Sequence, residues 1–210
     1  MHRSHTCGQL NAHHIGQKVT LSGWVANRRD HGGIIFIDLR DRYGLTQVVF
    51  DPQIHAEAAQ VVNAARSEWV IKIEWVVRAR PEGQANNDLF TGAIEILVNE
   101  CSILNKAKTP PFEISDHSTS SEDIRYKYRY LDLRRDVQRK KIEFRAQVNS
   151  YAREWFRKND FLEVQTPIFT VSSPEGARDY LIPSRLHPGK FYALPQAPQQ
   201  YKQLLMVGGF

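Results

Sequence analysis

The stretch GWVANRRDHGGIIFIDLRDRYGLTQVVFD, residues 23–51, decides the fold of the first half of this chain. It contains two apolar runs, at 34–39 and 45–50, which a polar turn, RDRYG, separates. Short apolar runs bounded by Gly, Asp and Arg are typical of β-strands. The alternating segment KVTLSGWV at 18–25 precedes them and predicts another strand. The chain is therefore expected to open with three strands.

The order of elements after this stretch indicates the fold class. An Ala-rich segment at 54–67 has helical periodicity, and further strands are predicted at 69–80 and 93–104. Three strands, a helix and two strands is the order of an OB-fold, a five-stranded barrel that binds oligonucleotides across its second and third strands. Other small barrels also have five strands. We predict an α+β protein in which residues 1–105 form an OB-fold β-barrel.

The second half reads differently. Residues 106–124 are rich in Pro, Ser and Thr and predict a linker, and we assign 106–140 to a hinge. Residues 138–158 carry apolar side chains at helical spacing, and FLEVQTP at 161–167 reads as a strand that Pro167 closes. Residues 141–210 are therefore expected to form a second part.

Composition excludes some classes of function. The 210 residues include two cysteines and eight histidines, and neither type shows the spacing of a metal site. The first residues contain no apolar run, so we expect neither a signal peptide nor a membrane anchor. We expect reduced thiols, no metal site and a cytoplasmic protein.

The net charge of +5 is concentrated in residues 125–145, RYKYRYLDLRRDVQRKKIEFR. Basic residues interleaved with tyrosines suit a nucleic-acid backbone with stacking groups nearby. A solvated, charged start of a helix explains the same pattern equally well.

Three residues of the barrel are candidates for nucleic-acid contact. Alternation places Phe36 on the face opposite the apolar residues of its strand, where a base could stack on it. A core phenylalanine remains the alternative. Gln47 interrupts an apolar strand and could read a base edge, or it could lie on an edge strand. Arg29 lies in the basic segment NRRDHGG and could contact a phosphate, although many surface turns are basic.

The second half has a candidate amino-acid site. Glu175 could bind an α-amino group, and Lys202, three residues after Gln199 on a possible helix, could bind a side-chain carboxylate. Spacing alone equally allows a solvated loop.

Together these segments resemble the N-terminal part of bacterial-type aspartyl-tRNA synthetases, which are class II enzymes. The resemblance covers nearly the whole chain and is carried by residues 23–51, RYKYRYLDLRR, FLEVQTPIFTVSSPEGARDYLIPSR and GKFYALPQAPQQYKQLLMVGGF. It implies an anticodon-binding OB domain, a hinge, and the start of an antiparallel-sheet catalytic domain that is incomplete here.

The resemblance also implies roles for individual residues. Phe36, Gln47 and Glu95 would face the tRNA anticodon, and Arg29 would bind it near its backbone. Those binding L-aspartate would be Glu175, Gln199, Gln200, Tyr201 and Lys202. Pro167 would belong to motif 1, at the interface of a homodimer. Ala197 departs from the serine that is usual in the family, which puts one hydrogen bond of the pocket in doubt.

His31 and Gly83 resemble the non-discriminating members of the family, which charge tRNA-Asn as well as tRNA-Asp with aspartate. The family uses ATP and Mg²⁺, but the motifs 2 and 3 that bind ATP are not among these residues. The resemblance therefore implies an aspartate–tRNA ligase of which this chain holds no catalytic residue and is by itself inactive. A stand-alone tRNA-binding module, or a sister synthetase for asparagine or lysine, remains an alternative.

Overall fold

The computed structural model describes residues 2–173 and 176–210. By their contacts the residues divide into two units, Met1–Lys140 and Lys141–Phe210. The first unit contains the barrel, and the second contains a small hairpin and two helical segments.

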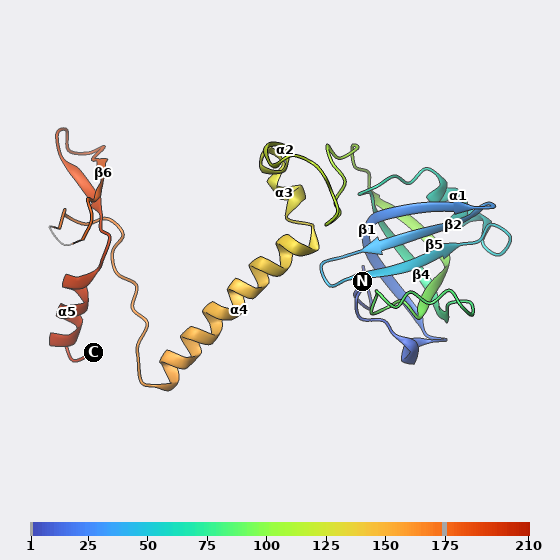
Figure 1. The fold of residues 1–210 in the computed structure, drawn as a ribbon, viewed down its shortest axis with the longest axis horizontal. Helices are drawn as coiled ribbons and strands as arrows, with labels where there is room; N and C mark the ends of the chain where they lie inside the picture. The colour runs from blue at the N-terminus through green and yellow to red at the C-terminus, as the bar shows by residue number, and fades with distance from the viewer. Residues whose placement is uncertain (1, 174–175) are drawn as a thin grey trace. The chain divides into compact units, whose positions relative to one another are not determined.

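Five strands of the first unit close into a barrel in the order β1-β2-β3-β5-β4 (Figure 1). The strands are β1 (Lys18–His31), β2 (Ile34–Arg40), β3 (Leu45–Phe50), β4 (Val70–Ala79) and β5 (Ile94–Asn105). The pairing of β3 with β5 is parallel, and the other pairings are antiparallel. The predicted five-stranded OB-fold is confirmed.

The barrel closes around inward-facing side chains at alternate strand positions. On β2 the buried residues are Ile35, Ile37 and Leu39, while Phe36 lies on the outer face, as the sequence pattern predicted. Helix α1 (Ala56–Asn63), shorter than the predicted 54–67, packs its small apolar face on the barrel.

Strand β1 is longer than predicted, because the basic segment NRRDHGG is not a turn for most of its length. Asn27–His31 continue β1 and pair with β2, and the turn is limited to Gly32 and Gly33. Both glycines have positive φ, of 63° and 90°, which a two-residue hairpin turn with the twist of the strands requires. The basic side chains therefore lie on the sheet itself.

The segment after the barrel contacts the barrel closely. Trp69 donates its indole N–H to the Ala107 carbonyl at 3.0 Å. Short helices α2 (Glu122–Lys127) and α3 (Arg129–Asp132) follow, and α4 (Asp136–Lys158) begins within the same unit. Residues 106–121 are mostly irregular, as their composition predicted.

The second unit contains the rest of α4, a hairpin of β6 (Tyr180–Pro183) and β7 (Phe191–Leu194), and α5 (Gln199–Val207). The strand predicted at 161–167 is wrong: these residues join no ladder. A strand forms only with a hydrogen-bonded neighbouring strand, and no described strand forms a ladder with this segment. Its apolar side chains, such as Phe161 and Leu162, are exposed.

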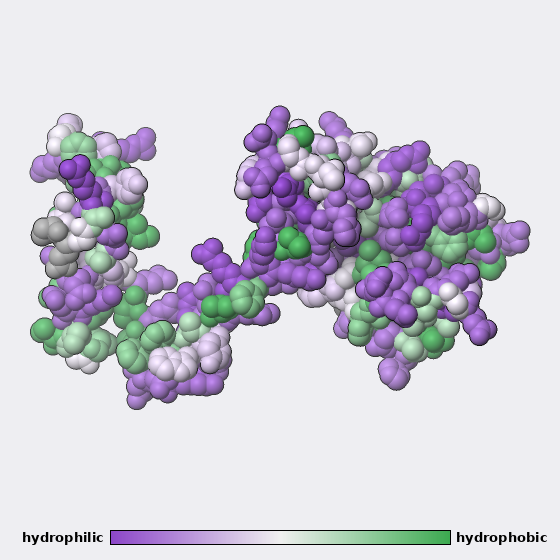
Figure 2. Space-filling model, viewed as in Figure 1, coloured by the Kyte–Doolittle hydropathy of each residue, from purple (hydrophilic) through white to green (hydrophobic). Residues whose placement is uncertain are grey.

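Helix α4 buries none of its residues against the described part of the chain. Its apolar face includes Ile142, Val148 and Trp155, each about half exposed. Figure 2 shows apolar patches at the surface of this helix and of the C-terminal segment. The predicted helix is thus confirmed, but its apolar face is uncovered.

Among the described residues, no helix combines the length and the apolar character needed to cross a bilayer. Cys7 and Cys101 are both free thiols.

Candidate nucleic-acid interface

A cleft of about 430 Å³ lies on the outer face of the barrel. Four residues that the sequence analysis proposed for tRNA contact line it together: Arg29, His31, Phe36 and Gln47. They come from β1, β2 and β3, so the cleft lies on the face where OB-folds bind oligonucleotides.

Strand register explains why these side chains meet. Arg29 of β1 is directly opposite Phe36 of β2, and Asp38 of β2 is directly opposite Gln47 of β3. Arg29 donates to the Asp38 carboxylate at 2.9 Å and to the Gln47 side-chain carbonyl at 3.4 Å. The Arg29 side chain is 41% exposed, so it stays accessible to a phosphate while two acceptors fix its position.

Phe36 presents its ring to the cleft. The imidazole of His31 contacts it edge-on, with 5.9 Å between the ring centroids. An edge contact orients an aromatic ring and leaves a face available for stacking. A nucleic-acid base is the natural occupant of such a face.

Gln47 is held from beneath by a buried carboxylate. Its side-chain nitrogen donates to Glu95 at 2.8 Å, and Arg78 donates to the other oxygen of Glu95 at 2.8 Å. Glu95 is only 1% exposed, so it supports the floor of the cleft and does not line its open surface. With its N–H₂ committed to Glu95, the amide of Gln47 has a fixed orientation.

Gly83 lies in the loop between β4 and β5, at the third position of a turn closed by a hydrogen bond of 3.0 Å from Gln84 N to Pro81 O. Its φ of 76° suits that position of a type II turn, where a residue with a side chain would be strained. The next residue, Gln84, lines the cleft.

Sequence reasoning missed the remaining residues of the cleft. They are Asp38, Leu45, Arg80, Gln84, Asn86 and Leu89. The amide-rich loop sequence PEGQANND offered a signal for two of them, because amides read bases. Arg80 donates to the Ile94 carbonyl at 3.1 Å, and burial lowers the pKa of its guanidinium.

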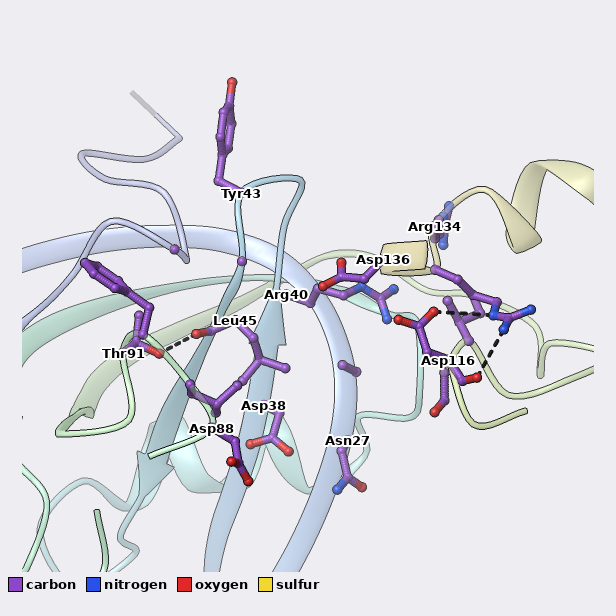
Figure 3. A pocket seen from close by; sticks show the side chains of 18 of the residues that line it. Asn27, Asp38, Arg40, Tyr43, Leu45, Asp88, Thr91, Asp116, Arg134 and Asp136 are labelled. Carbon is purple, nitrogen blue, oxygen red and sulfur yellow. Dashed lines mark hydrogen bonds and ion pairs between the residues drawn. The ribbon is translucent and has the colours of Figure 1, made fainter. Parts of the chain in front are cut away.

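A second cavity, of about 530 Å³, lies between the barrel and the segment 113–117 of the same unit (Figure 3). Charged side chains of both signs surround it, among them Arg40, Asp116, Arg134 and Asp136. Several arginines of the basic stretch 125–145 are paired here with carboxylates. Arg134 pairs with Glu68, and Arg135 with Asp132. This part of the stretch is therefore structural.

The candidate aspartate residues lie in the second unit, and Glu175 is outside the described residues. Gln199, Gln200, Tyr201 and Lys202 share the first turn of α5, as a helix there would place them. The Tyr201 hydroxyl is 3.0 Å from the Thr170 hydroxyl, which fixes the helix start to the bridge between Thr170 and Ala193.

Lys202 lines an apolar cavity of about 840 Å³ with residues from 156–166 and the end of α5. Gln199 and Gln200 are exposed and do not line it. Pro167 is also exposed. The described residues thus bring the anticodon candidates into one cleft, but they do not assemble an amino-acid pocket.

No group of three or more His, Cys, Asp and Glu residues in the described ranges could hold a metal ion. The Mg²⁺ that the family resemblance implies therefore finds no fitting ligand set in this part of the chain.

Two protein families match successive parts of this chain. Residues 19–104 match the OB-fold nucleic acid binding domain, and residues 121–210 match the class II tRNA synthetases for D, K and N.

Curated relatives are similar over the whole chain. The chain is 53% identical over 210 residues to the aspartate–tRNA(Asp/Asn) ligase of Desulfatibacillum aliphaticivorans and 58% identical over 213 residues to that of Corynebacterium kroppenstedtii. In both cases the match covers 100% of this chain and 35% of the relative. The chain thus spans about a third of their length.

Solved structures share the fold. Asparaginyl-tRNA synthetase from Pyrococcus horikoshii, solved with asparaginyl-adenylate, matches with a TM-score of 0.83 at 24% identity, over 99% of this chain and 46% of that one. A putative aspartyl-tRNA synthetase from Leishmania major matches with a TM-score of 0.79 at 20% identity, over 95% of this chain and 40% of that one.

Proposed function

From the premise that this chain belongs to the class II aminoacyl-tRNA synthetases, as the N-terminal part of an aspartyl-tRNA synthetase, we propose that it binds the anticodon of tRNA-Asp and tRNA-Asn. The observation that carries the proposal is the cleft in which Arg29, Phe36 and Gln47 meet on one face of the barrel. A cation, an aromatic ring and an oriented amide are groups with which proteins bind the backbone, stack on the bases and read the base edges of single-stranded RNA.

Each of these groups has a distinct role in the proposal. Phe36 stacks on an anticodon base, and Arg29 binds the adjacent phosphate. Gln47 reads the base edge with its carbonyl, because its N–H₂ is held by Glu95. His31 contacts Phe36, and Gly83 lies in the neighbouring loop. In the proposal these two residues allow the cleft to accept the anticodons of both tRNAs. The aspartate–tRNA(Asp/Asn) names of the relatives support this dual specificity.

The whole enzyme would activate L-aspartate with ATP and Mg²⁺, transfer it to tRNA, and work as a cytoplasmic homodimer. We assign anticodon binding to residues 1–105, a hinge to 106–140 and the start of the catalytic domain to 141–210. Lys202 would bind the substrate side-chain carboxylate with the help of Gln199, Gln200 and Tyr201, and Glu175 would bind the α-amino group. The uncovered apolar face of α4 and the motif containing Pro167 fit a dimer contact. The 210 residues alone would bind tRNA without activating aspartate.

A stand-alone RNA-binding module is less well supported, because residues 121–210 match the catalytic family and such a module would not need them.

The test is binding of fluorescent anticodon hairpins to the 210-residue chain. Hairpins with the aspartate anticodon GUC, the asparagine anticodon GUU and an unrelated anticodon are titrated against wild type, Phe36→Ala and Tyr43→Ala. Tyr43 is an exposed aromatic residue of the same barrel outside the cleft, which makes it the matched control. We expect tight binding of the first two hairpins only, lost in Phe36→Ala and retained in Tyr43→Ala. Equal binding of all three hairpins would leave only a general RNA-binding barrel.

A further inference from the structure

Glu68 is a buried carboxylate in a strained position that anticodon binding does not explain. It lies between α1 and β4, and its side chain is 3% exposed. Its φ of 65° is in the left-handed region, which a residue with a side chain adopts only where its surroundings hold it. A hydrogen bond of 2.8 Å from Glu68 N to the carbonyl of Val25 on β1 helps to hold it there.

Two arginines from distant segments meet on this carboxylate. Arg40, at the end of β2, donates to its two oxygens at 2.7 and 2.8 Å. Arg134, which follows α3, donates at 2.8 Å and also lies over the Trp24 ring, 4.7 Å from its centroid. Trp24 is the cross-strand partner of Arg40. Both guanidinium groups therefore lie at the same place on the barrel, beside Glu68.

From Arg134 the contacts continue to the start of α4. The neighbouring Arg135 is 6% exposed and donates to the buried Asp132 at 3.0 Å and to the Asp116 carbonyl at 3.2 Å. The Asp116 carboxylate in turn accepts from the amide of Val137, in the first turn of α4, at 3.2 Å. Figure 3 shows Asp116, Arg134 and Asp136 gathered beside Arg40. Ion pairs and hydrogen bonds, linked through the adjacent residues Arg134 and Arg135, therefore join β2 to the first turn of α4.

We propose that Glu68 is a positioning residue that latches residues 129–137 onto the barrel. Arg40 shares its face of β2 with Phe36 and Asp38 of the RNA cleft, so the latch fixes the start of α4 relative to the strand that carries the cleft. A tRNA held in the cleft then finds residues 129–137 at a fixed place on the same unit. This last consequence rests on the proposed anticodon binding, whereas the latch itself does not.

Hydrogen exchange of backbone amides tests the latch without RNA. Glu68→Gln keeps the side-chain shape but removes the charge that both arginines share. We expect at least ten-fold faster exchange at Leu133, Arg135 and Val137, with unchanged exchange in β3. Glu74→Gln is the matched control, because Glu74 pairs with Lys72 at the surface and touches neither arginine. Unchanged exchange at residues 133–137, or an equal increase throughout the barrel, would overturn the latch.

A second variant keeps the test valid if Glu68→Gln does not fold. Arg134→Met removes one of the two arginines that pair with Glu68, together with its contact over Trp24, and should produce the same local increase in exchange. The two changes combined should give less than the product of their separate effects, since they remove the same contact. Multiplicative effects would show that Glu68 and Arg134 act independently, which contradicts the latch.

Measurements of RNA binding distinguish a failure of the latch from a failure of the proposed function. Glu68→Gln should leave the affinity for anticodon hairpins within two-fold of wild type and weaken full-length tRNA at least five-fold. Equal affinity of wild type and variant for full-length tRNA would overturn the coupling. If wild type bound neither RNA, the proposed function would fail, while the exchange result would still decide whether the latch exists.

Discussion

Gln47 and Glu95 are joined side chain to side chain across the parallel pair of strands β3 and β5, with 2.8 Å between the Gln47 nitrogen and a Glu95 oxygen. Gln47 lines the cleft on the outer face of the barrel, and Glu95 is buried behind it. The orientation of the Gln47 amide, which is itself only 8% exposed, is therefore set by the interior of the barrel, so the proposed RNA binding and stability should depend on the same contact.

Replacing Glu95 should weaken both the proposed RNA binding and the stability of the barrel. Glu95→Gln would present a neutral amide to Gln47 and Arg78, so both donors would lose a charged acceptor and one of them would face an N–H₂ that cannot accept. We expect the free energy of unfolding to fall by about 1–3 kcal/mol in urea titrations. Glu100→Gln, at an exposed position of the same strand, should change it by less than about 0.5 kcal/mol. Equal stability of the two variants would show that the buried contact contributes nothing.

The loop that completes the cleft depends on Gly92. A side-chain carbon at this position would lie 1.7 Å from the Asn86 carbonyl oxygen, so Gly92→Ala must displace the loop that contributes Asn86 and Leu89. We expect a loss of about 1–3 kcal/mol in stability together with weaker hairpin binding. Gly16 has a positive φ of 85°, but a side-chain carbon there meets open space, so Gly16→Ala should leave hairpin binding unchanged. Wild-type binding by Gly92→Ala would exclude the loop from the interface.

His31 should influence the choice between the two tRNAs. Its ring contacts Phe36 at the edge of the cleft, so His31→Ala removes a wall without touching the core. We expect the ratio of affinities for GUU and GUC hairpins to change at least three-fold while the melting temperature stays within about 2 °C, as is usual for a surface substitution. An unchanged ratio would remove His31 from the account of specificity.

The two thiols should make stability fall at alkaline pH. Burial raises the pKa of Cys101 to about 12, and burial and Asp41 raise the pKa of Cys7 further. The neutral thiol is thus favoured in the folded state. Its contribution is fully present below the unfolded pKa, near 9.0, and is lost as pH rises toward the folded value. The loss is at most about 1.4 kcal/mol per pH unit for each thiol.

Urea titrations at several pH values between 7.5 and 10.5 measure this loss. Other groups also titrate in this range, so the comparison is with Cys101→Ala, whose profile should be flatter than that of wild type. Parallel profiles would contradict a raised pKa at Cys101.

The barrel could be predicted from sequence because the patterns that indicate its strands involve residues close together in the chain. Alternation placed Ile35, Ile37 and Leu39 inside and Phe36 outside, and the strand at 45–50 was predicted with its observed bounds. The extension of β1 was missed, because the Arg-rich residues before Gly32 suggest a turn until their pairing with β2 is known.

Long-range contacts could not be predicted in the same way. The partner of Arg134 is Glu68, 66 positions earlier, and no spacing rule relates them. The basic stretch therefore looked like an RNA-binding surface or a solvated helix. The strand predicted at 161–167 failed for a related reason, because the alternation of a strand describes its faces and does not supply its neighbour.

The roles of single residues in the cleft came from the family resemblance. Composition and alternation favoured Phe36 and left Gln47 and Arg29 ambiguous, and the resemblance assigned all three to the anticodon. The structure adds the register that makes Arg29 and Phe36 direct neighbours.

The most direct test of the account is a double-mutant cycle between Phe36 and the bases of the anticodon. Wild type and Phe36→Ala are titrated with the GUC hairpin and with three versions, each lacking one anticodon base. If Phe36 stacks on a base, removal of either partner should cost about 1–3 kcal/mol, and at one position the two losses should not add. Additive losses at all three positions would contradict the claim that this cleft reads the anticodon.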